Sequence, residues 1–250
     1  MLRTYGRRTF DFDRRVAVMA ILNRTPDSFY DRGATFGFEA ALAAADRALA
    51  EGADWLDVGG VKAGPGPPVS EAEELERVVS LVEALRDRTD AVVSVDTFRP
   101  GVARRALAAG ADVVNDPSGL HDPGLAEVAA EAGAGLVVMH TGGPPRTRDP
   151  GHDFHKNTFH SLELTRRLGE LADLGYPLLV ALSNKDFVGE ALDLPIDQRL
   201  EGSLAATALS VAAGANIVRV HQVQATVRVV RMTEAILGHR PPAVTRRGLA

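Results

Sequence analysis

The stretch AVVSVDTFRPGVARRALAAGADVVND, residues 91–116, contains one complete repeat of the pattern that decides the fold. Its first apolar run ends at the polar pair Asp96-Thr97, an Ala- and Arg-rich segment follows, and Gly110 precedes a second apolar run. A glycine just past a helix readily takes the left-handed backbone conformation that ends many helices. The stretch therefore predicts a strand, a helix over residues 100–109 and a second strand.

Similar apolar runs recur along the whole chain, and each is nearly free of polar residues, as expected of strands buried on both faces of a parallel sheet. Seven such runs lie at residues 16–22, 55–58, 91–95, 112–114, 135–139, 177–182 and 216–220. Helix-like segments alternate with them at residues 38–51, 71–88, 100–109, 124–132, 158–174, 197–213 and 223–237. No Gly-, Ser- or Pro-rich linker divides the pattern, so we expect a single domain over residues 1–250 with its core at about 16–238.

Polar residues follow the ends of these runs rather than precede them. In a (β/α) barrel the carboxyl ends of all strands share one face, where active sites are built. An open doubly wound sheet would instead gather a ligand at a single crevice. Because polar residues follow nearly every run, the α/β class with a TIM-type (β/α) barrel is favoured; these residues include Asn23, Asp57, Asp96, Asn115, His140, Asn184 and Arg219.

The number of strands does not fit a complete barrel. A closed barrel of this type has eight strands, whereas the sequence offers seven apolar runs. The widest spacing lies between the runs that begin at residues 135 and 177, and it holds only one clear helix. Because a βα unit takes roughly 30 residues, a unit is predicted to be missing there.

Composition narrows the class of protein. Of 250 residues 45% are hydrophobic, the net charge is −5 and cysteine is absent. These values disfavour disorder and nucleic-acid binding, and they exclude disulfides, thiolate metal sites and cysteine nucleophiles. No apolar run approaches the ~18 residues of a membrane span, and residues 1–15 lack the apolar segment of a secretory signal. We therefore expect a cytoplasmic protein that does not bind membranes.

The segment AILNRTPDSFYD, residues 20–31, resembles the opening signature of the dihydropteroate synthase family. Further motifs of that family follow in its order, at residues 52–60, 94–97, 114–116, 139–140, 149–151, 183–185 and 219–221. The resemblance implies a pterin-binding TIM barrel of folate biosynthesis. It also implies a transferase that condenses 6-hydroxymethyl-7,8-dihydropterin pyrophosphate with p-aminobenzoate, uses Mg²⁺, releases pyrophosphate and forms a homodimer.

The resemblance assigns pterin binding to Asp96, Asn115, Asp149 and Lys185. These residue types suit the ligand, because carboxylates accept from the ring N–H and amino groups. An amide and an ammonium can donate to ring nitrogen and carbonyl atoms. A helix N-cap for Asp96 and a solvated loop position for Lys185 are the structural alternatives.

The resemblance assigns pyrophosphate binding to Asn23, Arg219 and His221, with Asn23 as a Mg²⁺ ligand. Arg219 and His221 alternate along the last strand, so both side chains are predicted to face the same side of it. Arginine binds phosphate oxygens through two N–H groups. Together with Lys185, these two residues form the predicted catalytic set, which would stabilise the departing pyrophosphate.

The second loop departs from the family. After its paired glycines the family has Glu-Ser-Thr-Arg-Pro-Gly, whose Thr-Arg pair contacts p-aminobenzoate, whereas this chain has VKAGPG at residues 61–66. Ala63 and Gly64 occupy the Thr-Arg positions, and Lys62 offers a charge without the planar fork of arginine. Arg24 is expected to add a cation near the mouth of the barrel. This combination, with LSNKD at residues 182–186, resembles a divergent actinobacterial paralogue branch with weak or no synthase activity.

The resemblance also locates the missing unit. In the family a helix and a strand separate the Met-His motif from the Asp-Pro-Gly motif, but only the eight residues between Thr141 and Arg148, ends included, separate them here. An opened barrel, a loop that recruits another chain and a shortened sequence are the alternatives. For the function, a synthase is the leading hypothesis; a non-catalytic or regulatory pterin-binding paralogue and a pterin-dependent methyltransferase domain are the alternatives.

Overall fold

The computed structural model describes residues 1–25, 35–62, 68–139 and 156–246. Seven of its strands form one parallel sheet in the order β7-β6-β5-β4-β3-β9-β8. These strands are β3 (Ala17–Asn23), β4 (Trp55–Gly59), β5 (Val92–Asp96), β6 (Val113–Asp116), β7 (Gly135–Val138), β8 (Leu179–Val180) and β9 (Ile217–Val220). Because β9 pairs with β3, the end of the chain returns to the first strand of the sheet, as in a (β/α) barrel.

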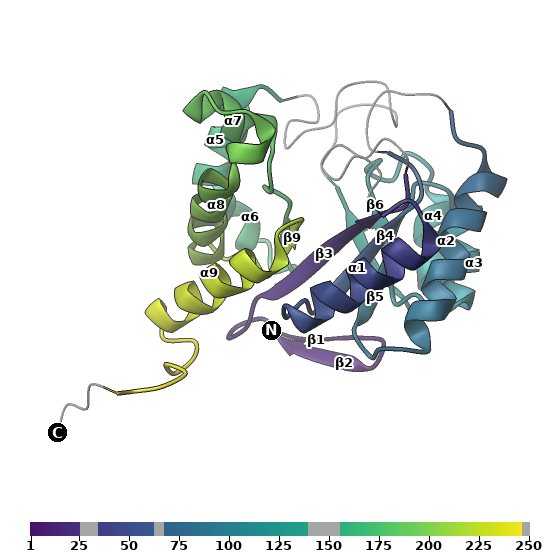
Figure 1. Cartoon of the computed structure of the whole chain (residues 1–250), viewed down its shortest axis with the longest axis horizontal. Helices are drawn as coiled ribbons and strands as arrows, with labels where there is room; N and C mark the ends of the chain where they lie inside the picture. The colour runs from purple at the N-terminus through teal and green to yellow at the C-terminus, as the bar shows by residue number, and fades with distance from the viewer. Residues whose placement is uncertain (26–34, 63–67, 140–155, 247–250) are drawn as a thin grey trace.

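Helices alternate with the strands and surround the sheet (Figure 1). They are α1 (Phe38–Ala50), α2 (Glu71–Arg86), α3 (Pro100–Ala108), α4 (Gly124–Glu131), α5 (Thr158–Arg166), α6 (Leu168–Ala172), α7 (Asp186–Leu192), α8 (Leu200–Ala212) and α9 (Val223–Ile236), with a short 3₁₀ helix at Ile196–Gln198. Gly52, Gly110, Gly133 and Gly214 follow four of these helices with positive φ, as their sequence context predicts.

The barrel is nearly closed. Strands β7 and β8 are the two edges of the seven-stranded sheet, and they flank the place that an eighth strand would take in a complete TIM-type barrel. The sequence predicts the missing helix–strand unit between the same two strands. The segment between Thr141 and Arg148, where we place it, lies outside the described residues.

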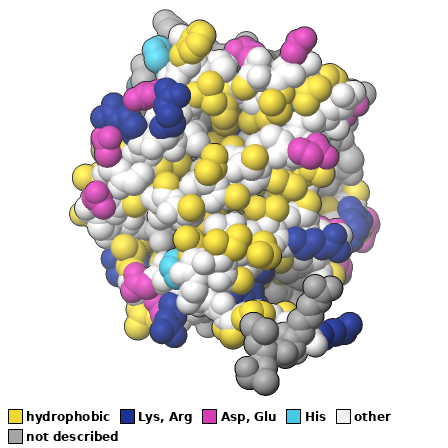
Figure 2. Space-filling view, turned by 90° about the vertical axis from the view of Figure 1, so that its left-hand side faces the viewer, with side chains coloured by type: hydrophobic (Ala, Val, Ile, Leu, Met, Phe, Trp, Pro, Cys, Tyr) yellow, Lys and Arg dark blue, Asp and Glu magenta, His cyan; other side chains and the backbone are white. Residues whose placement is uncertain are grey.

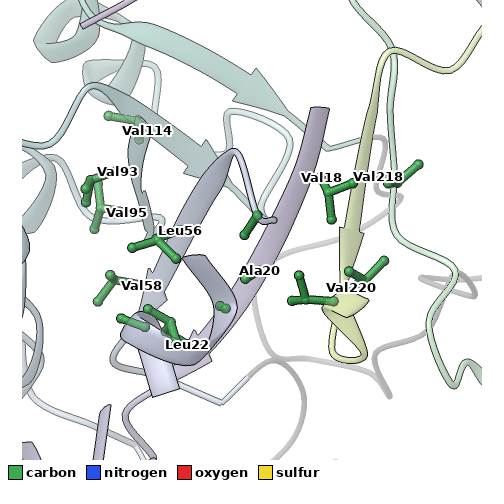
Figure 3. Packing of buried hydrophobic residues seen from close by; sticks show 14 of the residues in the cluster. Val18, Ala20, Leu22, Leu56, Val58, Val93, Val95, Val114, Val218 and Val220 are labelled. Carbon is green, nitrogen blue, oxygen red and sulfur yellow. The ribbon is translucent and has the colours of Figure 1, made fainter. Parts of the chain in front are cut away.

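The outward faces of the strands form the larger of two apolar clusters. Alternate residues of β3, β4, β5, β6 and β9 point toward the helices and are buried there, as the labelled side chains of Figure 3 show. Val18, Leu56 and Val93 are 0% exposed. The outward residues are buried in this cluster, and inward residues of the same strands are buried in the second cluster. Burial on both faces explains why the strands are continuous apolar runs in the sequence.

An amino-terminal hairpin covers the inward faces at the amino ends of the strands. It consists of β1 (Leu2–Tyr5) and β2 (Arg8–Asp11), and it lies below the sheet in Figure 1. Phe10 and Phe12 are buried against Trp55 and the neighbouring strand residues. The packed core therefore begins before residue 16, where the sequence places its start. Among the described residues no helix is long and apolar enough to cross a membrane.

Candidate active site

A layer of polar side chains lies inside the barrel, above the apolar layer that the hairpin covers. Three of its members stand two residues beyond an inward apolar residue of the same strand: Asp57 after Trp55, Asn115 after Val113, and Arg219 after Ile217. Asp96 pairs with Asn115 across the neighbouring strands β5 and β6. The period of two along a strand thus carries these side chains to the carboxyl half of the barrel interior.

Arg219 is the centre of this layer. Its Nε donates to Asp57 Oδ2 at 2.6 Å and its Nη2 donates to Asp96 Oδ2 at 2.7 Å. Asn115 donates from Nδ2 to the same Asp57 oxygen at 3.1 Å. Three of the predicted site residues, Asp96, Asn115 and Arg219, are therefore brought together, and Asp57 joins them.

Burial and charge shift the ionisation of this layer. Burial raises the pKa of Asp96 to about 7, and the neighbouring carboxylate of Asp57 adds to the rise while Arg219 opposes it. Burial alone would lower the pKa of Arg219, but the charges of Asp57 and Asp96 outweigh it and raise that pKa. The arginine thus stays charged, and Asp96 can take up or release a proton near neutral pH.

The sequence gives Asp57 no role of its own, although it lies within a family motif. Its side chain is 0% exposed, and its Oδ1 has no hydrogen-bond partner among the described residues. Ser94 is the register partner of Asp57 on β5. Its hydroxyl is also buried and has no hydrogen-bond partner among the described residues. Because buried polar atoms are nearly always hydrogen-bonded, these two atoms are open hydrogen-bonding positions that water or a polar ligand would satisfy. The signal in the sequence is the alternation of Asp57 with Trp55 and Gly59.

Asn23 ends β3 at the rim of this layer. A side-chain carbon on Gly59 would lie 3.3 Å from Asn23 Oδ1 and 3.6 Å from the Cβ of Asp96. Glycine at this position therefore leaves the amide oxygen of Asn23 uncrowded beside Asp96. Asp96 is not a helix N-cap, because α3 begins only after Arg99.

The connections after β8 and β9 contact each other beyond the ends of these strands. Ser183 donates from Oγ to Gln222 Oε1 at 3.0 Å, and the backbone N–H of His221 donates to Ser183 Oγ at 3.3 Å. Lys185 is the N-cap of α7, a helix that the sequence pattern does not reveal. Lys185 stands two residues after Ser183, so both residues lie in the connection that follows β8 and contacts the backbone of His221.

The second loop is described only in part. Lys62 is half-buried at its start, whereas Ala63 and Gly64 lie outside the described residues, as does Asp149. The sequence predicts Arg24 near the mouth, but its side chain lies against helices α1 and α2 instead. Its guanidinium donates to the backbone oxygen of Arg77 at 2.7 Å and lies 5.6 Å from the ring of Phe38, because the helices α1 and α2 offer it acceptors and an aromatic face.

The described residues hold no group of three or more His, Asp or Glu side chains that could bind a metal by themselves. Asn23 offers one amide oxygen near Asp96, whose carboxylate is paired with Arg219. This donor set fits a Mg²⁺ ion that enters with a phosphate-bearing substrate and keeps several waters, rather than an ion held by the protein alone.

Comparisons with known proteins identify the same family that the sequence motifs resemble. Residues 19–149 and 147–221 match a family model described as pterin binding enzyme, and the two matched segments overlap at residues 147–149, at the end of the segment where the missing unit is predicted. The "Inactive dihydropteroate synthase 2" of Mycobacterium leprae is 52% identical over 278 aligned positions, which cover 94% of this chain and 96% of that protein. Because 278 exceeds the 250 residues of this chain, that relative has residues without a counterpart here.

Two solved structures show the same architecture. The Yersinia pestis dihydropteroate synthase in a sulfonamide drug complex has a TM-score of 0.89 at 37% identity, and the match covers 96% of this chain and 100% of that chain. The Xanthomonas albilineans dihydropteroate synthase with 4-aminobenzoic acid has a TM-score of 0.83 at 36% identity over 97% of this chain and 100% of that chain. Both likenesses extend over nearly the whole barrel.

Proposed function

The chain belongs to the dihydropteroate synthase family of pterin-binding enzymes, and from this premise we propose that it binds 6-hydroxymethyl-7,8-dihydropterin pyrophosphate at the barrel mouth with little or no condensation with p-aminobenzoate. One observation carries the proposal: Arg219 is held between Asp57 and Asp96 next to Asn115 in the barrel interior. The chemistry needed for pterin and phosphate is present there, while the Thr-Arg pair of the second loop is absent from the sequence.

The pterin ring is bound by the polar layer. Asp96 and the unpartnered Oδ1 of Asp57 accept from its N–H and amino groups, and Asn115 and Lys185 donate to its ring nitrogen and carbonyl. We also assign Asp149, which is not among the described residues, to the pterin site. A buried ring of this kind gains affinity because its polar edge meets partners that are already oriented.

The pyrophosphate lies toward Arg219 and His221. Arg219 is already oriented by two carboxylates, so little rotamer freedom is lost when its remaining N–H groups meet a phosphate oxygen. Asn23 would hold Mg²⁺ together with the phosphates, and the ion would neutralise the charge that develops on the leaving group. In a productive reaction Arg219, His221 and Lys185 would stabilise the departing pyrophosphate while the arylamine attacks.

The acceptor side distinguishes this chain from an active synthase. Ala63 and Gly64 supply neither a hydroxyl nor a guanidinium to an aminobenzoate carboxylate, and a relative that is 52% identical is named inactive. The second candidate function is an active dihydropteroate synthase. The likeness to a synthase solved with 4-aminobenzoic acid favours it.

A single pair of measurements separates these functions. Isothermal titration with the pterin pyrophosphate and Mg²⁺ tests binding, and we expect saturable binding. Pyrophosphate release is then measured with and without p-aminobenzoate at the same protein concentration, and we expect no release that depends on p-aminobenzoate. Release that does depend on it would replace our proposal with the active synthase, and a failure to bind the pterin would refute both.

We also propose that the chain forms a homodimer through the face of helices α8 and α9. Figure 2 shows hydrophobic side chains spread over the side of the molecule that these helices occupy. Leu209, Met232 and Ile236 are 67%, 60% and 72% exposed. Exposed apolar patches of this kind mark interaction surfaces.

Light scattering after size-exclusion chromatography should give the mass of a dimer for the wild type. The double variant Met232→Glu with Ile236→Glu should give the mass of a monomer, and Val244→Glu in the tail should leave the dimer unchanged.

A further inference from the structure

A second buried carboxylate, Glu74, lies outside the cluster around Arg219. It stands on the apolar stripe of α2 with Val78 and Leu81, and its residue is 0% exposed. Thr97 donates from Oγ1 to Glu74 Oε1 at 2.7 Å, and Arg99 forms an ion pair with Glu74 Oε2. Each oxygen of this carboxylate is therefore engaged by the connection between β5 and α3.

Thr97 directly follows the site residue Asp96. Its backbone N–H donates to the oxygen of Asn115 at 3.1 Å, and its hydroxyl also accepts from the backbone N–H of Arg99 at 3.2 Å. The chain just beyond Asp96 is thus held on one side by β6 and on the other by Glu74. Such a buried, fully hydrogen-bonded charge is costly to rearrange, so it restricts the backbone around it.

The same network reaches the connection between β4 and α2. Arg99 donates from Nη2 to the backbone oxygen of Val69 at 2.6 Å, at the end of that connection. At its beginning, a side-chain carbon on Gly60 would lie 3.1 Å from Cγ of Glu74 and 2.8 Å from a methyl of Val78. Only glycine permits this approach. Glu74 therefore lies against the beginning of the β4–α2 connection, and its partner Arg99 is bonded to the end of it.

We propose that Glu74 is a positioning residue that couples the β4–α2 and β5–α3 connections and fixes the orientation of Asp96 toward Arg219. The proposal rests on the proposed pterin site but extends it to a residue that touches no ligand. Burial raises the pKa of Glu74, and the hydrogen bond from Thr97 and the charge of Arg99 oppose this rise. Both partners therefore favour the ionised form of the carboxylate.

Two disruptive variants of the network, one conservative variant and one matched control test the proposal in the full-length protein. Glu74→Gln keeps the size but removes the charge that pairs with Arg99, and Thr97→Val removes the hydroxyl, with Thr97→Ser as the conservative rescue. Glu83→Gln is the control, because it makes the same chemical change at an exposed position of α2. The readouts are the Kd for the pterin pyrophosphate and hydrogen–deuterium exchange at residues 60–62 and 97–101.

We expect Glu74→Gln and Thr97→Val to weaken pterin binding about tenfold and to raise exchange in both segments, whereas Thr97→Ser and Glu83→Gln stay near wild type. A lower melting temperature with unchanged Kd and unchanged exchange in the two segments would overturn the proposal. If the wild-type chain does not bind the pterin, the proposed function fails. The exchange comparison still decides the role of Glu74, because a rise in only one segment, or in neither, overturns the coupling.

Discussion

The guanidinium of Arg219 on β9 donates to Asp57 on β4 at 2.6 Å, although β3 separates these strands in the sheet. The contact therefore crosses the inside of the curved sheet. Asp57 is fully buried, and Asp96 shares the same arginine. Arg219 is thus both the phosphate-binding candidate and the counter-charge of two carboxylates.

Replacing Arg219 should destabilise the fold as well as the site. Arg219→Gln leaves Asp57 and Asp96 buried without their cation, and breaking a buried pair in this way costs about 3 kcal/mol in the free energy of unfolding. Urea denaturation measures this loss. The double variant Asp57→Asn with Arg219→Gln should lose less than the sum of the two single variants, because the neutral pair leaves fewer charges unpaired. Strict additivity would contradict the coupling.

The stability of the protein should depend on pH through Asp96. Its folded-state pKa of about 7 lies above the unfolded value, so the native state binds the proton more tightly. Its contribution is fully present below about pH 4 and is lost as the pH rises toward 7, by at most about 1.4 kcal/mol per pH unit. Urea denaturation of wild type and Asp96→Asn across this window should show the wild type losing stability relative to the variant. A wild type whose stability relative to the variant stays constant or increases as the pH rises would refute the shift.

Much of the fold could be predicted because its strands are buried on both faces. Seven apolar runs and the glycines that follow four helices lie where the structure has strands β3–β9 and helix ends. The hairpin β1–β2 could not be predicted, since it is short and charged, and only packing under the barrel buries Phe10 and Phe12. Helix α7 has seven residues and begins inside a motif, so no periodicity reveals it.

The site was predictable where it depends on strand alternation and on motifs. Asp96, Asn115 and Arg219 meet inside the barrel as those patterns indicate. Asp57 and Glu74 required the structure, because their partners lie on distant elements. In both cases a sequence signal exists: a carboxylate stands on a stripe of residues that is otherwise apolar.

Substitutions in the second loop should increase the affinity for p-aminobenzoate rather than reduce it. Ala63→Thr with Gly64→Arg restores the hydroxyl and the guanidinium of the family's loop, and it should tighten p-aminobenzoate binding in the presence of pterin and pyrophosphate by at least about tenfold, or about 1.4 kcal/mol. Ala63→Thr with Gly64→Lys is the matched control. Its ammonium lacks the planar fork, so a smaller gain is expected. Equal affinity for wild type and the Thr-Arg variant, measured by titration calorimetry, would rule out the loop as the cause of weak acceptor binding.

The amino-terminal hairpin should stabilise the barrel from the end opposite the site. Phe10 is 1% exposed, its ring lies 5.7 Å from that of Phe12 in a stacked arrangement and 6.0 Å from that of Trp55. Phe10→Ala should lower the free energy of unfolding by about 3–5 kcal/mol, because it removes a large buried ring and leaves a cavity. Leu2→Ala is the control, since Leu2 is 67% exposed and its loss should cost under about 0.5 kcal/mol.

Fluorescence gives a second measurement of the same packing. Trp55 is the only tryptophan, so its emission should shift to longer wavelength in Phe10→Ala as water reaches it. Equal stability of the two variants would show that the hairpin covers the barrel without stabilising it.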